Sequence, residues 1–160
     1  MRRVGVCLLA LALFVPMAAA GPPKPAPFDI DFKKKPGGPW IEYTSGQKRV
    51  GQEPKAVFWR VRNQDTGDQD VSVEERRSGD GQDDYRIRWF RGDKDVTNDL
   101  RGPGYEFTFA SDESRKFKAT IKAKKANPGP LCLTPAFTAL AQPDVTYSYS
   151  LYVNDSSVCG

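Results

Sequence analysis

The sequence predicts an all-β protein, an antiparallel β-sandwich of about seven to eight strands. Runs of alternating apolar and polar residues recur at short intervals and are separated by Gly, Asp, Asn and Ser. After residue 20 no segment keeps a helical period. Two cysteines remain in that part of the chain, an even number that suits a disulfide-linked sandwich.

The N-terminus has the pattern of a secretory signal peptide over residues 1–20. Arg2 and Arg3 precede an apolar run over residues 4–15, and Ala18, Ala19 and Ala20 form a small-residue cleavage site. The alternative, a membrane anchor, would need roughly 20 apolar residues. We therefore expect a secreted, periplasmic or cell-envelope protein with no membrane span in the mature chain.

Charge does not point to nucleic acid as a partner. Removing Arg2 and Arg3 with the leader lowers Lys plus Arg from 24 to 22, against 20 Asp plus Glu. The net charge of the mature chain is then near +2, too small to imply nucleic acid.

Residues 21–39 are predicted to be a flexible arm. They contain six prolines, a run of three lysines at 33–35 and a glycine pair, a composition that supports neither a helix nor a ladder. Residues 28–32 alternate well, so a short edge strand there remains an alternative. The sandwich domain is expected over residues 40–160.

One strand is predicted to be the centre of the sheet. Over residues 85–97, apolar Tyr85, Ile87 and Trp89 alternate with Arg86 and Arg88 before a glycine turn, so the wet face of this strand is basic. Weaker alternating runs flank it on both sides. The other predicted strands are 40–44, 56–63, 71–75, 96–100, 105–109, 115–125 and 145–153.

The clearest alternation lies at residues 115–125. Phe117, Ala119, Ile121 and Ala123 would face the core. The opposite face would carry Lys116, Lys118, Lys122 and Lys124 together with Thr120. A lysine row is a usual protection of an edge strand against aggregation, which is the interpretation we favour. The alternative is a binding stripe for an anionic polymer.

The C-terminal part begins with a proline-rich interruption at residues 127–144. Within it, Thr134 and Pro135 followed by good helix formers favour a short helix before the last strand. In the last strand, Tyr152 falls on the polar face. Tyr152 and Trp40 are the aromatic residues expected to be exposed for contact with a ligand.

Cys132 and Cys159 are predicted to form a disulfide that clamps the last strand. Cys7 leaves with the leader, and an exported chain reaches an oxidising compartment. The two cysteines are too far apart for a redox Cys-x-x-Cys motif. An intermolecular bridge or two free thiols are the alternatives.

Three groups of motifs follow one another between residues 57 and 124. The first is Val61-Arg62-Asn63 with Thr66-Gly67-Asp68, the second Trp89-Phe90-Arg91-Gly92 with Asp95-Val96-Thr97, and the third Gly102-Pro103-Gly104-Tyr105 before an alternating strand. This stretch resembles the immunoglobulin-like repeats of exported bacterial proteins. The resemblance implies an immunoglobulin-like sandwich at the cell surface, used as a spacer or contact module. It implies no catalytic residue.

The residue types restrict the chemistry. The absence of histidine excludes Ser-His-Asp and Cys-His nucleophiles and the common zinc sites. The remaining enzyme option is a carboxylate pair, Glu74 with Glu75 or Asp83 with Asp84, in a hydrolase acting on extracellular polysaccharide. Adjacent strand residues point to opposite faces, which counts against Glu74 with Glu75.

Two further patterns are better explained by turns. The aspartates at 65, 68 and 70 and those at 80, 83 and 84 offer Ca²⁺ ligands, but Asp is also a preferred turn residue. Arg91-Gly92-Asp93 is an integrin-type tripeptide at a predicted turn. We expect an exported, non-enzymatic binding or structural module without cofactor or metal, whose partner is a protein or a surface polymer.

Overall fold

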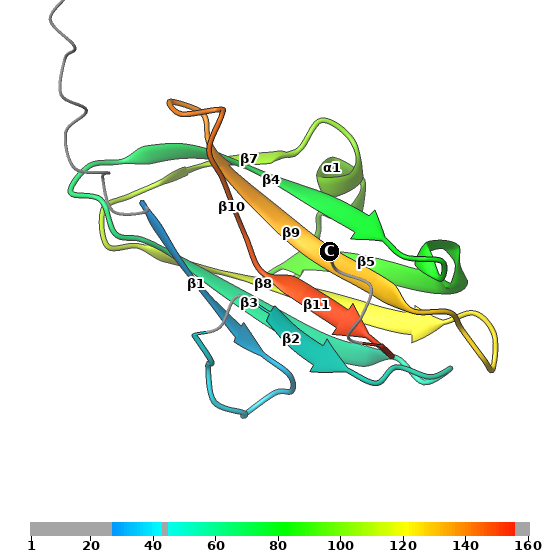
Figure 1. The fold of residues 1–160 in the computed structure, drawn as a ribbon. Helices are drawn as coiled ribbons and strands as arrows, with labels where there is room; N and C mark the ends of the chain where they lie inside the picture. Colours follow the sequence, from blue (N-terminus) through cyan, green and yellow to red (C-terminus); the bar gives the residue numbers. More distant parts are fainter. Residues whose placement is uncertain (1–26, 43–44, 156–160) are drawn as a thin grey trace, which may run out of the picture.

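The chain forms two facing β-sheets, a β-sandwich (Figure 1). The computed structural model describes residues 27–42 and 45–155. The predicted signal peptide lies outside the described residues. In the part of the chain that is described, no helix is long and apolar enough to cross a membrane.

The five-stranded sheet is antiparallel throughout. Its order across the layer is β1, β3, β8, β5 and β6. The bounds of these strands are Phe28–Lys33 for β1, Lys55–Asn63 for β3, Ser114–Ala123 for β8, Tyr85–Arg91 for β5 and Lys94–Asp95 for β6.

The second sheet runs in the order β2, β11, β9, β4 and β7, and β10 also pairs with β9. One of its pairings is parallel, that of β2 with β11. The bounds are Ser45–Lys48 for β2, Ser150–Val153 for β11, Leu131–Ala139 for β9, Gln69–Ser78 for β4, Tyr105–Phe109 for β7 and Thr146–Ser148 for β10.

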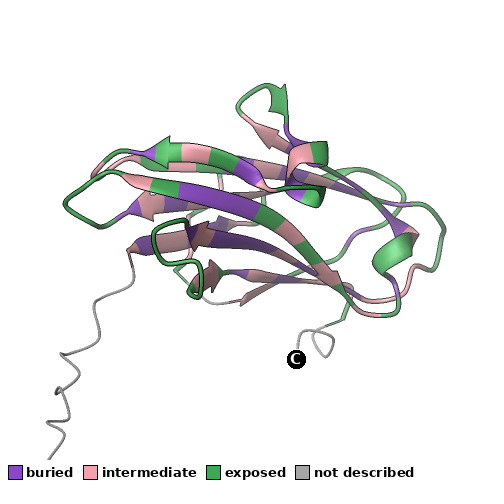
Figure 2. Cartoon of the chain, turned by 90° about the horizontal axis from the view of Figure 1, so that it is seen from above, coloured by how far each residue is buried: buried purple, intermediate pink, exposed green. Residues whose placement is uncertain are grey.

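Aromatic residues from both sheets fill the space between the layers. The rings of Trp59 and Trp89 lie 4.9 Å apart between centroids, and neither residue is accessible to solvent. Phe32 of β1 stacks on Tyr149, also at 4.9 Å. Burial follows the side of each strand that faces the opposite layer (Figure 2), as the period-two alternation predicts.

The sheet centre is β8, so two expectations are wrong. β5 was expected at the centre, but only the two-residue β6 lies beyond it. Interpreting the lysine row of β8 as edge protection also fails, because β3 and β5 pair with β8 along its two sides. Alternation within a strand reveals its faces but not its neighbours, which come from distant segments.

The helix expected to begin at Thr134 is strand β9. Pro135 is compatible with this strand because of its position along one edge of β9. At this residue the neighbouring strand on that edge changes from β11 to β10. β11 pairs with Leu131–Leu133 and β10 with Ala136–Thr138, so on this side of β9 neither strand pairs with Pro135 or needs its missing N–H. The strand expected at 96–100 is also wrong, because these residues form the short helix α1, Thr97–Arg101. A 3₁₀ turn, η1, spans Gln82–Asp84.

Other elements differ in extent. β1 lies within the range expected to be an arm and is the short strand left open as an alternative. Of the expected strand at 40–44, the described residues 40–42 form one bridge, between Ile41 and Phe32. The last strand divides into β10 and β11. The described residues contain eleven strands, more than the seven to eight expected. Short strands such as β2 and β6 carry too few residues to show alternation in the sequence.

Candidate functional site

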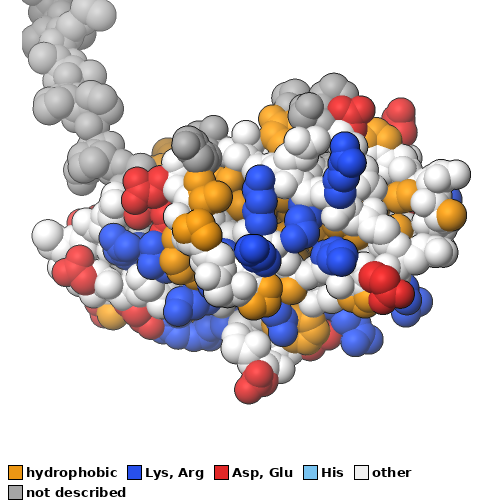
Figure 3. All heavy atoms as spheres, turned by 90° about the horizontal axis from the view of Figure 1, so that it is seen from below, with side chains coloured by type: hydrophobic (Ala, Val, Ile, Leu, Met, Phe, Trp, Pro, Cys, Tyr) orange, Lys and Arg blue, Asp and Glu red, His pale blue; other side chains and the backbone are white. Residues whose placement is uncertain are grey.

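The outward side chains of β8 and β5 form a basic surface on the five-stranded sheet. Alternate residues of a strand share a face, so each strand contributes a row of cations. We name this surface the basic face, and its cations are Lys116, Lys118, Lys122, Arg86 and Arg88. In the view from below, Lys and Arg side chains gather across the middle of the surface, with acidic side chains mainly at its margins (Figure 3).

The five cations of the basic face have no ion-pair partner among residues 27–42 and 45–155. The neighbouring strand β3 differs. There Arg60 is paired with Asp31, while Arg62 lies 3.9 Å from a carboxylate oxygen of Asp29. The five cations of the basic face therefore differ from Arg60 of β3, whose charge is held by a direct ion pair.

Two of the cations lie side by side. Arg86 is directly opposite Lys122 in the register of β5 and β8. Like charges at directly opposite positions destabilise an antiparallel pair. Local conflicts of this kind are expected where a surface serves function rather than folding.

Aromatic rings lie between the cations. Phe90, opposite Lys118 in the register, carries the Lys118 Nζ atom 4.5 Å from its ring centroid. Phe58 is its counterpart on β3, also half-buried and opposite Lys118 on the other side. The basic face thus combines charge with flat apolar surface, to which the faces of sugar rings can pack.

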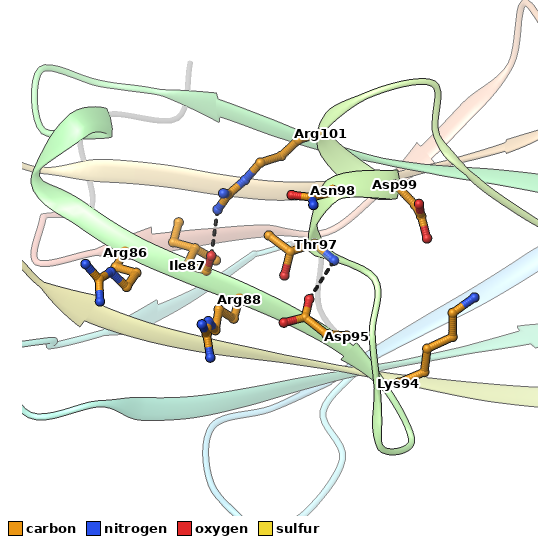
Figure 4. Close-up of a pocket in the computed structure, with 9 residues that line it drawn as sticks. All are labelled: Arg86, Ile87, Arg88, Lys94, Asp95, Thr97, Asn98, Asp99 and Arg101. Carbon is orange, nitrogen blue, oxygen red and sulfur yellow. Dashed lines mark hydrogen bonds between the residues drawn. The ribbon is translucent and has the colours of Figure 1, made fainter.

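An open hollow of about 700 Å³ lies at the β5 end of the basic face (Figure 4). Arg86 and Arg88 project from β5 at its wall. Arg101 reaches back from α1 and donates to the Ile87 carbonyl at 2.6 Å, and its guanidinium also pairs with Glu75. Asp95 accepts from the Thr97 backbone N–H at 3.0 Å, and the Thr97 hydroxyl and N–H lower the pKa of the Asp95 carboxyl.

Three of the four predicted lysines lie on β8, and the fourth lies just beyond it. Lys124 follows the last residue of β8 and donates to the Asp83 carbonyl at 2.8 Å. It still lines a second open hollow, of about 490 Å³, together with Arg86 and Lys122. The lysine row and the arginines of β5 therefore meet on one surface.

The sequence predicts Arg86 and Arg88 on a basic wet face but does not join them to the lysines. The signal was present in the alternation of residues 85–91. What was missing was the pairing of β5 with β8, two segments separated by about 30 positions.

The two predicted aromatic contacts are not brought together. The Lys33 ammonium lies 4.7 Å from the centroid of the Trp40 ring, and the Arg60 guanidinium lies 4.8 Å from it. Trp40 is half-buried on the five-stranded sheet. Tyr152 is half-buried on β11 in the other sheet, so the two residues do not share a surface.

Neither predicted carboxylate pair presents two free groups to one substrate. Glu74 points outward with its side chain half-exposed, whereas the side chain of Glu75 is 2 % exposed and faces inward. Asp84 accepts from the Gly129 N–H at 2.7 Å and pairs with Lys125 at 2.9 Å. These contacts lower the pKa of the Asp84 carboxyl.

In the predicted Asp-rich turns, carboxylates accept hydrogen bonds from nearby backbone and side-chain groups. Asp65 accepts from the Thr66 N–H at 2.8 Å, and Asp70 from the Thr108 hydroxyl at 2.8 Å. Three carboxylates converge neither in the group at 65, 68 and 70 nor in the group at 80, 83 and 84. In the described part of the chain, the carboxylates that do converge are those of Asp29, Asp31 and Glu42.

In the tripeptide Arg91-Gly92-Asp93 at the β5–β6 turn, the arginine contacts other described residues of the fold and the aspartate does not. Arg91 donates to the Tyr105 hydroxyl at 2.6 Å and lies over the ring of Phe107. Gly92 has a φ of 59°, which explains the glycine as a turn requirement, and Asp93 is exposed.

The predicted disulfide involves a residue outside the described part. Cys132 is buried in β9, opposite Tyr152 of β11 and Ser78 of β4. Cys159 lies beyond the described residues, so the pairing remains a prediction.

Comparison with known proteins establishes the fold alone. No family model and no curated protein matches the sequence. A family 123 glycoside hydrolase from Clostridium perfringens is similar in structure, with a TM-score of 0.52 at 8 % identity. The match covers 80 % of this chain and 27 % of that one, so this chain spans about a quarter of the length of the hydrolase.

Two other solved structures are similar with lower scores. A FixG-related protein from Vibrio parahaemolyticus has a TM-score of 0.49 and 8 % identity over 82 % of this chain and 98 % of that one. A PapD-like domain of human CEP192 has a TM-score of 0.49 and 11 % identity over 90 % and 95 %. The two facing sheets make the protein a β-sandwich, a fold that also forms part of the longer hydrolase chain.

Proposed function

We propose that this protein is an exported, non-catalytic binding module that holds an anionic polysaccharide on the basic face. The observation that carries the proposal is the set of five cations on two adjacent strands without ion-pair partners among the described residues. Uncompensated charge of one sign on a surface attracts ligands of the opposite sign.

The shape of the basic face favours a polymer over a small anion. The cations are spread over two strands instead of converging on one point. Residues two apart on a strand lie roughly 7 Å from each other, and neighbouring strands lie about 4.8 Å apart. An extended chain with repeated anionic groups can meet several cations at once, and many weak contacts then add up to useful affinity.

The half-buried rings favour a sugar polymer. Phe58 and Phe90 are half-buried on either side of Lys118, whose ammonium lies over the Phe90 ring. A polymer that carries both carboxylate or sulfate groups and apolar ring faces matches this alternation of charge and aromatic surface. The near-neutral net charge of the mature chain limits non-specific attraction to nucleic acid.

Export to the cell envelope or outside the cell is part of the same proposal. It rests on the signal-peptide pattern at residues 1–20 and on the predicted disulfide. The alternative of a polysaccharide hydrolase lacks a carboxylate pair among its candidates, because Glu75 and Asp84 are both held by donors.

Retention of the purified protein on a sulfated polysaccharide matrix tests the proposal. Replacing Arg88 and Lys118 by Gln should lower the salt concentration needed for elution, because each contact is a screened charge interaction. The matched control replaces Arg49 and Arg76, two exposed cations outside the basic face, by Gln.

Equal retention of the two double variants would show that the basic face is not the site. Stronger retention on duplex DNA than on the polysaccharide would contradict the choice of polymer. Cleavage of the polysaccharide by the protein would contradict the non-catalytic part of the proposal.

A further inference from the structure

Three carboxylates converge beside β1, away from the basic cations of β8 and β5. Asp29 and Asp31 lie on β1, and Glu42 follows the residue that bridges back to it. One carboxylate oxygen from each residue lies within 4.8 Å of the others. No motif in the sequence pointed to this group.

Backbone pairing explains the convergence. Phe32 and Ile41 exchange both of their backbone hydrogen bonds, at 3.0 and 2.9 Å. The next pair along, Asp31 and Glu42, therefore occupies a position without hydrogen bonds, where opposite side chains come closest. Asp29 lies two residues from Asp31 on the same side of the strand.

Nearby cations compensate this charge only in part. Arg60 donates to Oδ2 of Asp31, from Nε at 2.7 Å and also from Nη2. The nearest basic nitrogen of Arg62 is 3.9 Å from Asp29, and Glu42 has no ion-pair partner among the residues described. The carboxylates of Asp29 and Glu42 thus lie close together, and within the described ranges the only ion contact between them and a basic residue is the weak one from Arg62 to Asp29.

One oxygen in the group lacks a donor altogether. Oδ1 of Asp31 is buried and accepts no hydrogen bond, and the Asp31 side chain is 2 % exposed. Buried carboxylate oxygens are normally satisfied by donors or by a metal ion. Because Arg60 occupies Oδ2, Oδ1 is the atom through which Asp31 can meet a further cation.

We propose that Asp29, Asp31 and Glu42 bind a divalent cation of the calcium type. The donors are all carboxylate oxygens, which suit hard cations, and Ca²⁺ tolerates irregular geometry with water completing its shell. Asp29 and Glu42 line an open hollow of about 260 Å³, which offers a route for the ion and room for its water. Zinc would favour nitrogen or sulfur ligands.

The position gives the cation a structural effect. Glu42 lies on the segment that leads from β1 towards β2, and β2 belongs to the opposite sheet. The same hollow is lined by Tyr147 and Tyr149 from the edge of that sheet. A cation bound by all three carboxylates would hold this connection against β1 and relieve the repulsion between them.

Terbium luminescence and thermal unfolding of the purified protein test the site. Tb³⁺, a calcium substitute, should be sensitised by Tyr147 or Tyr149. Saturating Ca²⁺, at about 100 times its Kd, should raise the unfolding temperature by at least about 5 °C. The Asp29→Asn, Glu42→Gln variant should lose both signals while keeping Asp31 and its ion pair with Arg60.

Asp83→Asn, Asp93→Asn is the matched control, since it removes two exposed carboxylates elsewhere. It should behave as the unmodified protein does. No response of the unmodified protein to millimolar Ca²⁺ would overturn the proposal. So would equal responses of the two double variants, or a clear preference for Zn²⁺.

Discussion

The indole N–H of Trp89 donates to the carboxylate of Glu75, joining β5 of one sheet to β4 of the other. The same carboxylate accepts from Arg101 of α1 at 2.8 Å and from Arg77 at 2.7 Å. One acidic side chain therefore holds together both layers and the short helix. Glu75 is a structural residue, and its neighbour Glu74 faces the other way.

Replacing Glu75 by Gln should lower the free energy of unfolding by about 2–3 kcal/mol. Breaking a buried ion pair costs roughly 3–5 kcal/mol, and we reduce this value because the Arg101 side chain is 39 % exposed. Urea denaturation measures the change. Glu74→Gln, on the outer face, should stay within about 0.5 kcal/mol of the original protein. Equal effects of the two changes would contradict the assignment.

Replacing Lys122 by Glu should stabilise the fold and weaken polymer binding together. The new carboxylate would face Arg86 across the strands and convert a repulsive pair into an attractive one. We expect a gain of about 0.2–1 kcal/mol. Arg86→Gln removes the repulsion without adding attraction, so its stability should fall in between. A loss of stability in Lys122→Glu would show that the repulsion is unimportant.

Asp84 should make stability fall at acid pH. The Lys125 ammonium and the Gly129 N–H lower the pKa of this carboxyl below its ordinary value of 3.8. The resulting stabilisation is present above pH 3.8 and is lost as pH falls through the lowered pKa. Asp84→Asn should therefore be less stable at pH 7, with a difference that shrinks towards pH 2.

Urea unfolding at a series of pH values checks this expectation. Asp83→Asn is the control, because the Asp83 side chain makes no ion pair within the described residues. A difference between Asp84→Asn and the original protein that stays constant from pH 7 to pH 2 would contradict it.

Cys132 and Cys159 should be joined within one chain. Intact mass under non-reducing conditions should show a monomer that takes up two alkyl groups only after reduction. The double Ser variant should lose about 2–5 kcal/mol and keep a strand-rich circular dichroism spectrum. A disulfide-linked dimer would refute the intramolecular bridge.

Faces of strands were predictable from the sequence, because alternation is a local property. Lys118 and Phe117 were assigned to opposite sides of their strand, and the structure confirms both assignments. Position within a sheet was not predictable in the same way. That β8 is central depends on β3 and β5, and nothing in residues 114–123 records which strands lie beside them.

Two other features could not be predicted from the sequence, because the local pattern there is misleading or absent. Pro135 with its flanking residues has the local signature of a helix start, but burial between β4 and the β10–β11 pair outweighs that preference. The carboxylates of Asp31 and Glu42 meet through a single bridge between Phe32 and Ile41. One bridge leaves no periodic trace in the sequence.

The placement of the first and last described strands bears on how the molecule responds to pulling. β1 begins at Phe28 at one end of the sandwich, and β11 ends at Val153 at the other (Figure 1). Their ladder hydrogen bonds lie across the strands. Tension along the chain would therefore shear β1 against β3 and β11 against β9, straining every rung at once instead of opening them one after another. A protein tethered at both ends would resist extension until these ladders slide as whole units.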